Sequence, residues 1–280
     1  MFCQEKFLKM INEQGRAELT YKTTPQRDLQ LTFLPPICKK YNKAPIYFII
    51  PGGGWHVETR QSMIDFSSQS VEMLRAEGFA VVSIDYRVRP EGVVMREILA
   101  DCFDAARYVA HFADELGVDK DCFVTSGHSA GAHLALMLAY APQDAFQDGC
   151  EFTDAFKVKA TAVMSAPTAL QDNSTNNLRN LKDLFVGEPQ GEMARTSPIT
   201  YVTDACPPTF LSAGTSDYLV FANSSEMLYE KLVACGVKCE LLLSIGGGHC
   251  FEQIHGWVQP SVAMSEVQEK LVQFIRANIG

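Results

Sequence analysis

The 280-residue sequence contains no hydrophobic run close to the roughly 20 residues that a membrane-spanning helix needs. Its first residues carry charges throughout and lack the apolar core of a signal peptide, so we expect no export signal. It also has no basic stripe, because 24 Lys and Arg face 33 Asp and Glu, a net charge of −9. We therefore expect neither a membrane nor a nucleic acid among the partners.

Cysteines give no sign of a disulfide framework or a metal site. There are nine, an odd number, and they are scattered over the chain. Cys235 and Cys239 are four residues apart but belong to no zinc-like framework. Reduced thiols in a cytoplasmic protein are the simplest interpretation, and we expect no metal and no cofactor.

Strand and helix patterns alternate from residue 46 to the end, which is typical of a parallel sheet with helices on both faces. We expect an α/β protein with a single domain over residues 1–280 and a sheet of about eight strands. Residues 166–206 form the one long irregular insertion, expected as a lid or pocket wall with a short helix near 178–186. The expected strands are 19–24, 29–34 (an antiparallel start), 46–50, 79–84, 123–125, 158–164, 209–213 and 239–244; the expected helices are 1–18, 62–77, 93–116, 130–140, 222–235 and 265–277.

Residues Cys122–Tyr140, CFVTSGHSAGAHLALMLAY, organise the chain. A β-branched run leads into Gly-His-Ser-Ala-Gly and then into a helix of small residues, the strand–turn–helix setting of a nucleophile elbow. Side chains at Gly127 and Gly131 would collide with the neighbouring strand and helix. The pattern predicts Ser129 as a nucleophile, rather than a residue of a purely structural turn.

A serine nucleophile needs a base, and the base needs an orienting acid. Asp217 follows the strand 209–213 and His249 follows the strand 239–244, so both should reach the same sheet edge as Ser129. Other candidates for the acid lie in the same interval, and His255 is the rival base. We prefer Asp217 and His249 because each follows a clear strand end; the competing acids are Asp172, Asp183 and Asp204.

Three glycines, Gly52 to Gly54, directly follow the buried strand 46–50. Without side chains, their backbone N–H groups can turn toward a negatively charged oxygen. Gly53 and Gly54, together with the N–H of Ala130, would form an oxyanion hole. The alternative is a phosphate-binding turn, but no G-x-G-x-x-G pattern and no following Lys-Ser/Thr pair support it.

Three separated motifs then coincide: PGGGW at 51–55, DYRVRPE at 85–91 and GHSAG at 127–131. With GTSDYLV at 214–220 and GGGHCF at 246–251, the chain resembles the α/β-hydrolase esterase/lipase family, which is related to hormone-sensitive lipase and to small bacterial carbohydrate acetyl and feruloyl esterases. The resemblance runs from about residue 44 to the end. It departs from the family pattern at Pro51, where the family has a histidine.

The resemblance implies an α/β-hydrolase fold and a serine ester hydrolase with Ser129 as nucleophile, His249 as base and Asp217 as acid. It also implies that Gly53, Gly54 and Ala130 donate to the oxyanion, and that residues 85–87 and 91 organise the loop beneath the site. The expected partner is a small-molecule ester, with a monomer or a homodimer left open.

Only about 18 residues precede the first strand, so we expect an open site for short acyl chains, including acetyl groups on sugars. Six side chains are candidates for its pocket: Trp55, His128, Phe185, Tyr201, Phe251 and Trp257. Two alternatives remain: an amide-cleaving enzyme such as an arylformamidase or a small peptidase, because the same triad serves both, and a non-catalytic binding module of the same fold.

Overall fold

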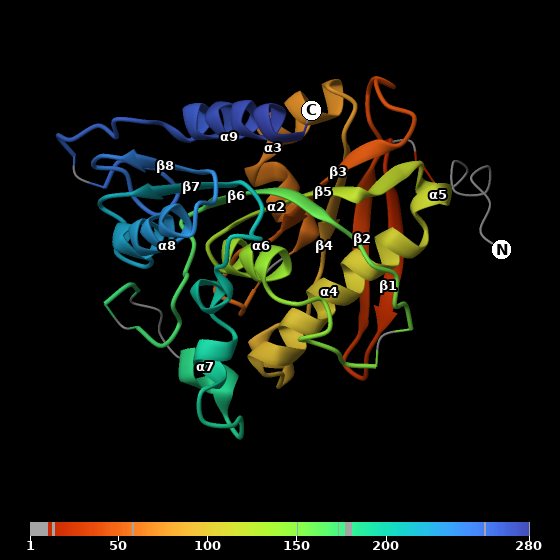
Figure 1. The fold of residues 1–280 in the computed structure, drawn as a ribbon, viewed down its shortest axis with the longest axis horizontal. Helices are drawn as coiled ribbons and strands as arrows, with labels where there is room; N and C mark the ends of the chain where they lie inside the picture. The colour runs from red at the N-terminus through yellow and green to blue at the C-terminus, as the bar shows by residue number, and fades with distance from the viewer. Residues whose placement is uncertain are drawn as a thin grey trace.

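An eight-stranded sheet runs through the computed structural model, with the strand order β1-β2-β4-β3-β5-β6-β7-β8 (Figure 1). The structure describes residues 11–12, 15–57, 59–149, 151–172, 174–176, 181–254 and 256–279. β1 and β2 pair antiparallel, as do β2 and β4, and every other neighbouring pair is parallel. The carboxyl ends of β3 to β8 therefore share one edge, which is the edge where the predicted site residues lie.

The strands are β1 (Ala17–Thr23), β2 (Asp28–Leu34), β3 (Ala44–Ile50), β4 (Ala80–Ile84), β5 (Val118–His128), β6 (Val158–Met164), β7 (Thr209–Gly214) and β8 (Cys239–Ser244). The α-helices are α2 (Arg60–Phe66), α3 (Ser68–Ala76), α4 (Met95–His111), α5 (Ala113–Leu116), α6 (Ala130–Tyr140), α7 (Glu192–Arg195), α8 (Ala222–Ala234) and α9 (Met264–Ile279). Short 3-10 helices are η1 (Arg89–Glu91), η2 (Leu181–Phe185) and η3 (Pro198–Tyr201). The predicted α/β class, with a mostly parallel sheet of about eight strands, is confirmed.

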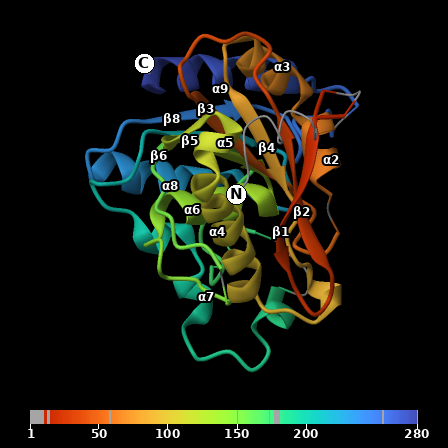
Figure 2. The ribbon, with the colours of Figure 1, turned by 90° about the vertical axis from the view of Figure 1, so that its right-hand side faces the viewer.

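Two helical layers cover the sheet (Figures 1 and 2). One apolar cluster joins the sheet to α2, α3 and α9, and the other joins it to α4, α5, α6 and α8. β3 is buried along its whole length, as its continuous apolar sequence predicts for a strand covered on both faces. In the first layer α3 packs against α9, so that the last helix of the chain lies beside α2 and α3.

Helix 62–77 was expected to be continuous, but Ser67 divides it into α2 and α3. The Ser67 N–H bonds back to Met63 and Asp65 carbonyls, and the residue ends one helix while preceding the next. The Ser67 hydroxyl does not cap either helix, because it points to Met63 Sδ at 3.9 Å, and apolar periodicity gives no sign of this break. In the same way, the predicted helix 93–116 is α4 followed by α5, and it stops at left-handed Gly117 as expected.

The strand predicted at 123–125 is longer, because β5 begins at Val118. The polar first half of β5 adopts the strand conformation because it pairs with β3, where Ala44 lies opposite Val118. Most of the predicted helix 1–18 lies outside the described residues, and its last two residues, Ala17 and Glu18, open β1 instead. The short helix predicted near 178–186 lies partly outside them too, and its described part is η2.

The insertion 166–206 is fastened to the helices beneath it. Thr168 exchanges three hydrogen bonds with Ser224 of α8, and His133 of α6 donates from Nε2 to the Thr196 carbonyl at 2.6 Å. These contacts bring α7 and η3 against the helical layer, below α6 in Figure 1.

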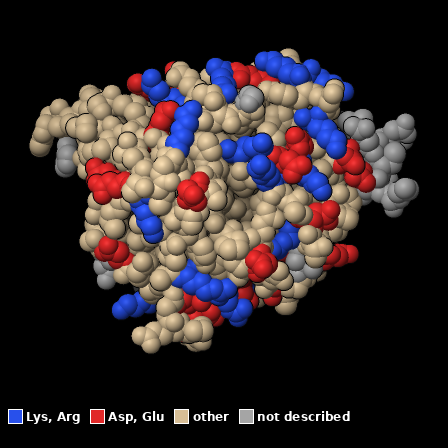
Figure 3. Space-filling model, in the orientation of Figure 1, with Lys and Arg blue, Asp and Glu red and all other residues tan. Residues whose placement is uncertain are grey.

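Lys and Arg alternate with Asp and Glu over the described part of the face in Figure 3, and neither sign gathers into one field there. Among the described helices, none is long and apolar enough to cross a membrane.

Candidate active site

Ser129 lies in a backbone conformation that few residues adopt. β5 ends at His128 and α6 begins at Ala130, and between them Ser129 has φ 55° and ψ −122°. Such a conformation costs on the order of 1–3 kcal/mol and persists only where the surrounding structure fixes it. The turn at Ser129 has the strained geometry of a nucleophile elbow.

The glycines on either side make this turn possible. A Cβ at Gly127 would overlap the backbone of Gly131, and a Cβ at Gly131 would overlap the carbonyl oxygens of Ile50 and Pro51. β3, β5 and α6 therefore approach one another more closely than any side chain allows, which explains why both positions are glycine.

Asp217 and His249 come from loops after β7 and β8 and form a hydrogen bond. The His249 Nδ1 lies 2.6 Å from Asp217 Oδ2. The other carboxylate oxygen of Asp217 accepts the N–H groups of Leu219 at 2.8 Å and Val220 at 3.1 Å, which fixes its orientation. Because a carboxylate only accepts, Nδ1 carries the proton and Nε2 is left as the basic nitrogen.

The His249 loop also reaches the nucleophile elbow. His128, the residue before Ser129, lies with its ring 4.6 Å from the His249 ring and donates from Nε2 to the His249 carbonyl at 2.8 Å. In the described part of the chain the Ser129 hydroxyl has no hydrogen-bond partner of its own. In unliganded hydrolases the serine–histidine bond is often long and tightens only when substrate binds.

The three-glycine loop after β3 presents unused donors. Gly53 and Gly54 have φ of 97° and 65°, both are exposed, and within the described residues their N–H groups and that of Ala130 have no protein acceptor. The Ala130 N–H lacks an intrahelical partner because it opens α6. A Cβ on Gly52 would overlap the His128 carbonyl oxygen at 2.6 Å and would touch Ser129 Cβ at 3.5 Å. The loop and the serine therefore border the same space.

Tyr86 fixes that loop from below. Its buried hydroxyl lies 2.8 Å from the Pro51 carbonyl oxygen and 3.1 Å from that of Gly52. Two loop carbonyls turned toward Tyr86 leave the following N–H groups free to face the other way. Sequence reasoning assigned residues 85–87 a structural role but did not find this contact, because it joins side chain and backbone across 35 residues.

A cavity of about 140 Å³ opens beside the glycine loop. Its lining residues are Gly52, Gly53, Ser62, Met63, Phe66 and His128. Of the six predicted pocket side chains, His128 is the one that lines this cavity. Phe66 faces His128 at a ring distance of 4.6 Å, and the α2 side of the wall was not foreseen from the sequence.

The other predicted pocket aromatics are placed differently. Phe251 and Trp55 are only 3% and 2% exposed and pack in the apolar core, Phe251 on the α9 side and Trp55 edge-on against His133. Phe185 and Tyr201 are partly buried against the core, and the Tyr201 hydroxyl donates to the Arg195 carbonyl. Trp257 is 88% exposed on the loop before α9. The rival base His255 lies outside the described residues.

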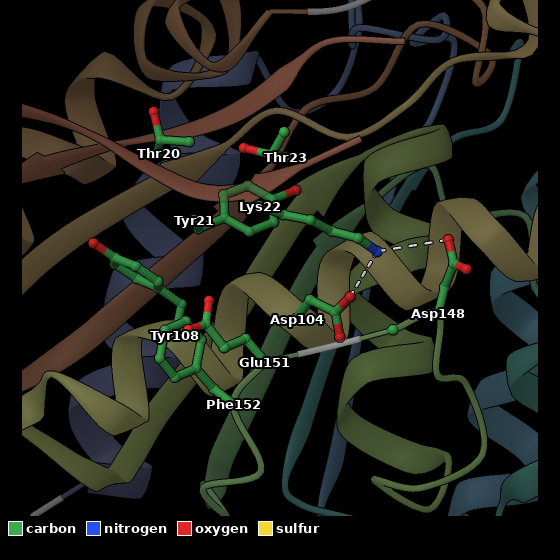
Figure 4. A pocket seen from close by; sticks show the side chains of 10 residues that line it. Thr20, Tyr21, Lys22, Thr23, Asp104, Tyr108, Asp148, Glu151 and Phe152 are labelled. Carbon is green, nitrogen blue, oxygen red and sulfur yellow. Dashed lines mark hydrogen bonds and ion pairs between the residues drawn. The ribbon is translucent and has the colours of Figure 1, made fainter. Parts of the chain in front are cut away.

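A second, polar pocket of about 330 Å³ lies between β1 and α4 (Figure 4). Lys22 extends into it; its Nζ lies 2.7 Å from Asp104 Oδ2 and 3.7 Å from Asp148 Oδ2.

Among the described residues, no group of three or more His, Cys, Asp or Glu side chains is arranged to hold a metal ion.

The chain matches the BD-FAE family over residues 33–232, well over half its length. It belongs to the BD-FAE family. Esterase LipQ of Mycobacterium tuberculosis is 30% identical to it, with 74% of this chain and 50% of LipQ aligned. The isoprenylcysteine alpha-carbonyl methylesterase of Arabidopsis thaliana is 24% identical over 89% of this chain and 59% of its own length. The chain spans between about half and three fifths of these two relatives.

Among solved structures, a propionate-bound esterase from Thermogutta terrifontis superposes with a TM-score of 0.77. It is 24% identical and 94% of each chain is covered, which shows that the α/β-hydrolase fold is shared. The resemblance to the α/β-hydrolase esterase/lipase family inferred from the motifs is thereby confirmed.

Proposed function

We propose that this BD-FAE family member is a serine carboxylic-ester hydrolase acting on short acyl esters, with acetyl groups on sugars as one substrate class. The observation that carries the proposal is the hydrogen bond from His249 to Asp217 beside a strained Ser129 whose hydroxyl has no partner among the described residues. The free N–H groups of Gly53, Gly54 and Ala130 supply the remaining requirement, donors for an oxyanion.

In the proposed reaction the Ser129 Oγ attacks the ester carbonyl carbon while His249 Nε2 takes the hydroxyl proton. The carbonyl oxygen becomes an anion held by the N–H groups of the glycine loop and Ala130. As the tetrahedral intermediate collapses, His249 returns the proton to the leaving alcohol. A water molecule then attacks the acyl-enzyme by the same route and releases the acid.

The proposal of short acyl groups is supported by the size of the cavity beside the loop. At about 140 Å³ it is far smaller than the roughly 300–1,000 Å³ that hold drug-sized ligands. Met63 and Phe66 of α2 supply the apolar side chains of its lining. An acyl group bound there would have room for only a few carbon atoms.

Seven cysteines in the described chain carry free thiols, which supports the proposal of a reducing compartment such as the cytoplasm; they are Cys38, Cys102, Cys122, Cys206, Cys235, Cys239 and Cys250.

The function is tested with a substrate panel: p-nitrophenyl acetate, butyrate and octanoate, an acetylated xylo-oligosaccharide, an N-formyl anilide and a peptide anilide. We expect acetate and butyrate to be hydrolysed fastest and Ser129→Ala to lose about 10⁶-fold in kcat with an unchanged circular dichroism spectrum. Faster cleavage of either anilide would replace the ester assignment with amide chemistry. No turnover of any substrate would favour a binding module.

Phe66→Ala tests the acyl cavity. Removing the ring enlarges the cavity, so kcat/KM for octanoate should rise about tenfold relative to acetate, the scale that hydrophobic pocket contacts usually give. Phe112→Ala is the matched control, since this partly buried ring packs near α5 on the opposite helical layer. An unchanged octanoate-to-acetate ratio in Phe66→Ala would place the acyl group elsewhere.

A further inference from the structure

The backbone carbonyl of His249 accepts two hydrogen bonds from two different strand ends. His128, the last residue of β5, donates from Nε2 at 2.8 Å, and Ser165, the residue after β6, donates from Oγ at 2.9 Å. β5 and β6 are paired, with His128 opposite Met164, so the two donors stand next to each other at the sheet edge. The carbonyl oxygen has two lone pairs, and both are used.

The position of the His128 ring is fixed by contacts with two other rings. It packs against Phe66 at 4.6 Å on one side and against the His249 ring at 4.6 Å on the other. Burial, and to a lesser degree the neighbouring His249, lowers the pKa of His128 to about 4. The ring is therefore neutral near pH 7, and because a carbonyl only accepts, its single N–H is on Nε2.

Ser165 is held in a conformation that its residue type does not favour. Its φ is 51°, it is fully buried, and its N–H donates to the Ser212 carbonyl of β7 at 2.8 Å. A left-handed residue other than glycine or asparagine costs about 1–2 kcal/mol. Glycine would avoid this cost, but it would also remove the hydroxyl that reaches His249.

Together with Asp217, these donors fix the position of His249 at both its side chain and its backbone. Asp217 holds the ring at Nδ1, while His128 and Ser165 hold the backbone of the same residue. The loop itself is closely packed, because a Cβ at Gly214 would overlap the carbonyl oxygens of Gly247 and Gly248. Nε2 is the one hydrogen-bonding atom of the ring that these contacts leave for Ser129.

We propose that His128 and Ser165 are paired positioning residues, which hold the His249 backbone so that Nε2 faces the Ser129 hydroxyl. The proposal rests on the proposed function, in which His249 is the base. Neither residue touches the reacting atoms in this role. Since a displacement of about 1 Å can cost a hundredfold in rate, a small shift of the His249 loop is sufficient to matter.

The test uses His128→Phe, Ser165→Ala and the double variant. His128→Phe keeps a ring against Phe66 but removes the N–H, and Ser165→Ala removes the hydroxyl while keeping the same backbone preference. We expect each single variant to lose about tenfold in kcat for p-nitrophenyl acetate. KM should stay unchanged in Ser165→Ala, whereas in His128→Phe it also reflects the cavity that this ring lines. The double variant should lose about a thousandfold, more than the product, because either donor alone still fixes the carbonyl.

Two control variants remove comparable groups elsewhere. Ser83→Ala deletes a buried hydroxyl that donates to the Arg60 carbonyl at 2.8 Å. His111→Phe replaces the histidine that ends α4, which is hydrogen-bonded to Asp154. Both should keep the kcat of the unmodified protein. His128→Gln, whose side-chain amide can donate to the same carbonyl, should recover most of the activity lost in His128→Phe, which a merely packed ring would not do.

A readout independent of turnover is the far-downfield proton signal of the Nδ1–H between His249 and Asp217 in the ¹H NMR spectrum. It should shift and broaden in the double variant and stay unchanged in both controls. If the unmodified protein hydrolyses no ester, the proposed function fails, yet this signal still decides the positioning role. An unchanged signal with unchanged kcat in a folded double variant would overturn the proposal.

Discussion

Two of the polar clusters in the described part of this molecule use their hydrogen-bonding groups in opposite ways. Around Lys22 and Arg87, beside β1 and α4, every buried charge is matched: Lys22 bonds to Asp101 and Asp104, and Arg87 bonds to Asp101 through two nitrogens at 2.8 Å. Burial opposes the charge on Lys22, but the two aspartates outweigh it and its pKa is raised. The charges of these side chains are therefore used within the cluster itself.

At the other cluster the hydrogen bonds form a chain with open ends. Asp217 is satisfied by two backbone N–H groups and His249, but the chain ends at Nε2 and at the free Ser129 hydroxyl. Three N–H groups nearby have no acceptor within the described chain. In the first cluster the charges are paired within the fold, whereas at the second the reactive groups are those that strained or glycine-rich backbone leaves without partners among the described residues.

The largest expected effect on activity, short of removing the nucleophile, is that of Asp217→Asn. The amide can no longer hold His249 as the Nδ1–H tautomer, so kcat for p-nitrophenyl acetate should fall about 10⁴-fold. Unfolding in urea should change far less than activity does. A loss of under tenfold in kcat would show that this hydrogen bond does not orient a base.

Arg87→Met should lower stability with little effect on activity, the opposite of Asp217→Asn. It removes two hydrogen bonds from the fully buried Asp101, which keeps Lys22 as a cation, so the cost should be below the roughly 3–5 kcal/mol of a buried pair that loses its one partner. Urea unfolding should show this loss while kcat per folded molecule stays near that of the unmodified protein. Arg276→Met, at the exposed pair with Glu77, is the control and should cost about 1 kcal/mol or less.

Acid should weaken the protein through His133, where the insertion meets α6. Burial lowers the pKa of this ring to about 4, below its usual 6.5. Between these values the unfolded chain binds more protons, so the free energy of unfolding decreases as pH falls from 6.5 toward 4. The loss is roughly 3 kcal/mol for this ring, in addition to that from His128.

Urea unfolding measured from pH 7.5 to 4 checks this dependence. His133→Gln, which can still donate to the Thr196 carbonyl, should give a shallower pH profile. The same slope in the variant would show that another group controls the acid transition.

The sequence was sufficient to predict a position where the local backbone geometry requires one particular residue type. The elbow glycines and the strand-end positions of Asp217 and His249 could be placed because the turn and the sheet edge demand them. The bounds of α6 and β6 also follow from their own residues. The sharp stop of the helical segment at Gly117 is of the same kind.

What depends on distant partners could not be predicted. Ser165 carries no local signal, because its left-handed backbone makes sense only with Ser212 and His249, the latter 84 residues further on. Phe251 follows His249 closely and looked like a pocket residue, but the turn at its φ of 61° directs it into the core instead. Tertiary contacts decide both cases.

Whether Ser129 is an activated nucleophile is most directly tested by fluorophosphonate labelling, followed by intact-mass analysis and peptide mapping. We expect a single adduct on Ser129, no adduct in Ser129→Ala, and much slower labelling in Asp217→Asn. No adduct on the folded, unmodified protein, or an adduct on a different serine, would contradict the assignment of this site.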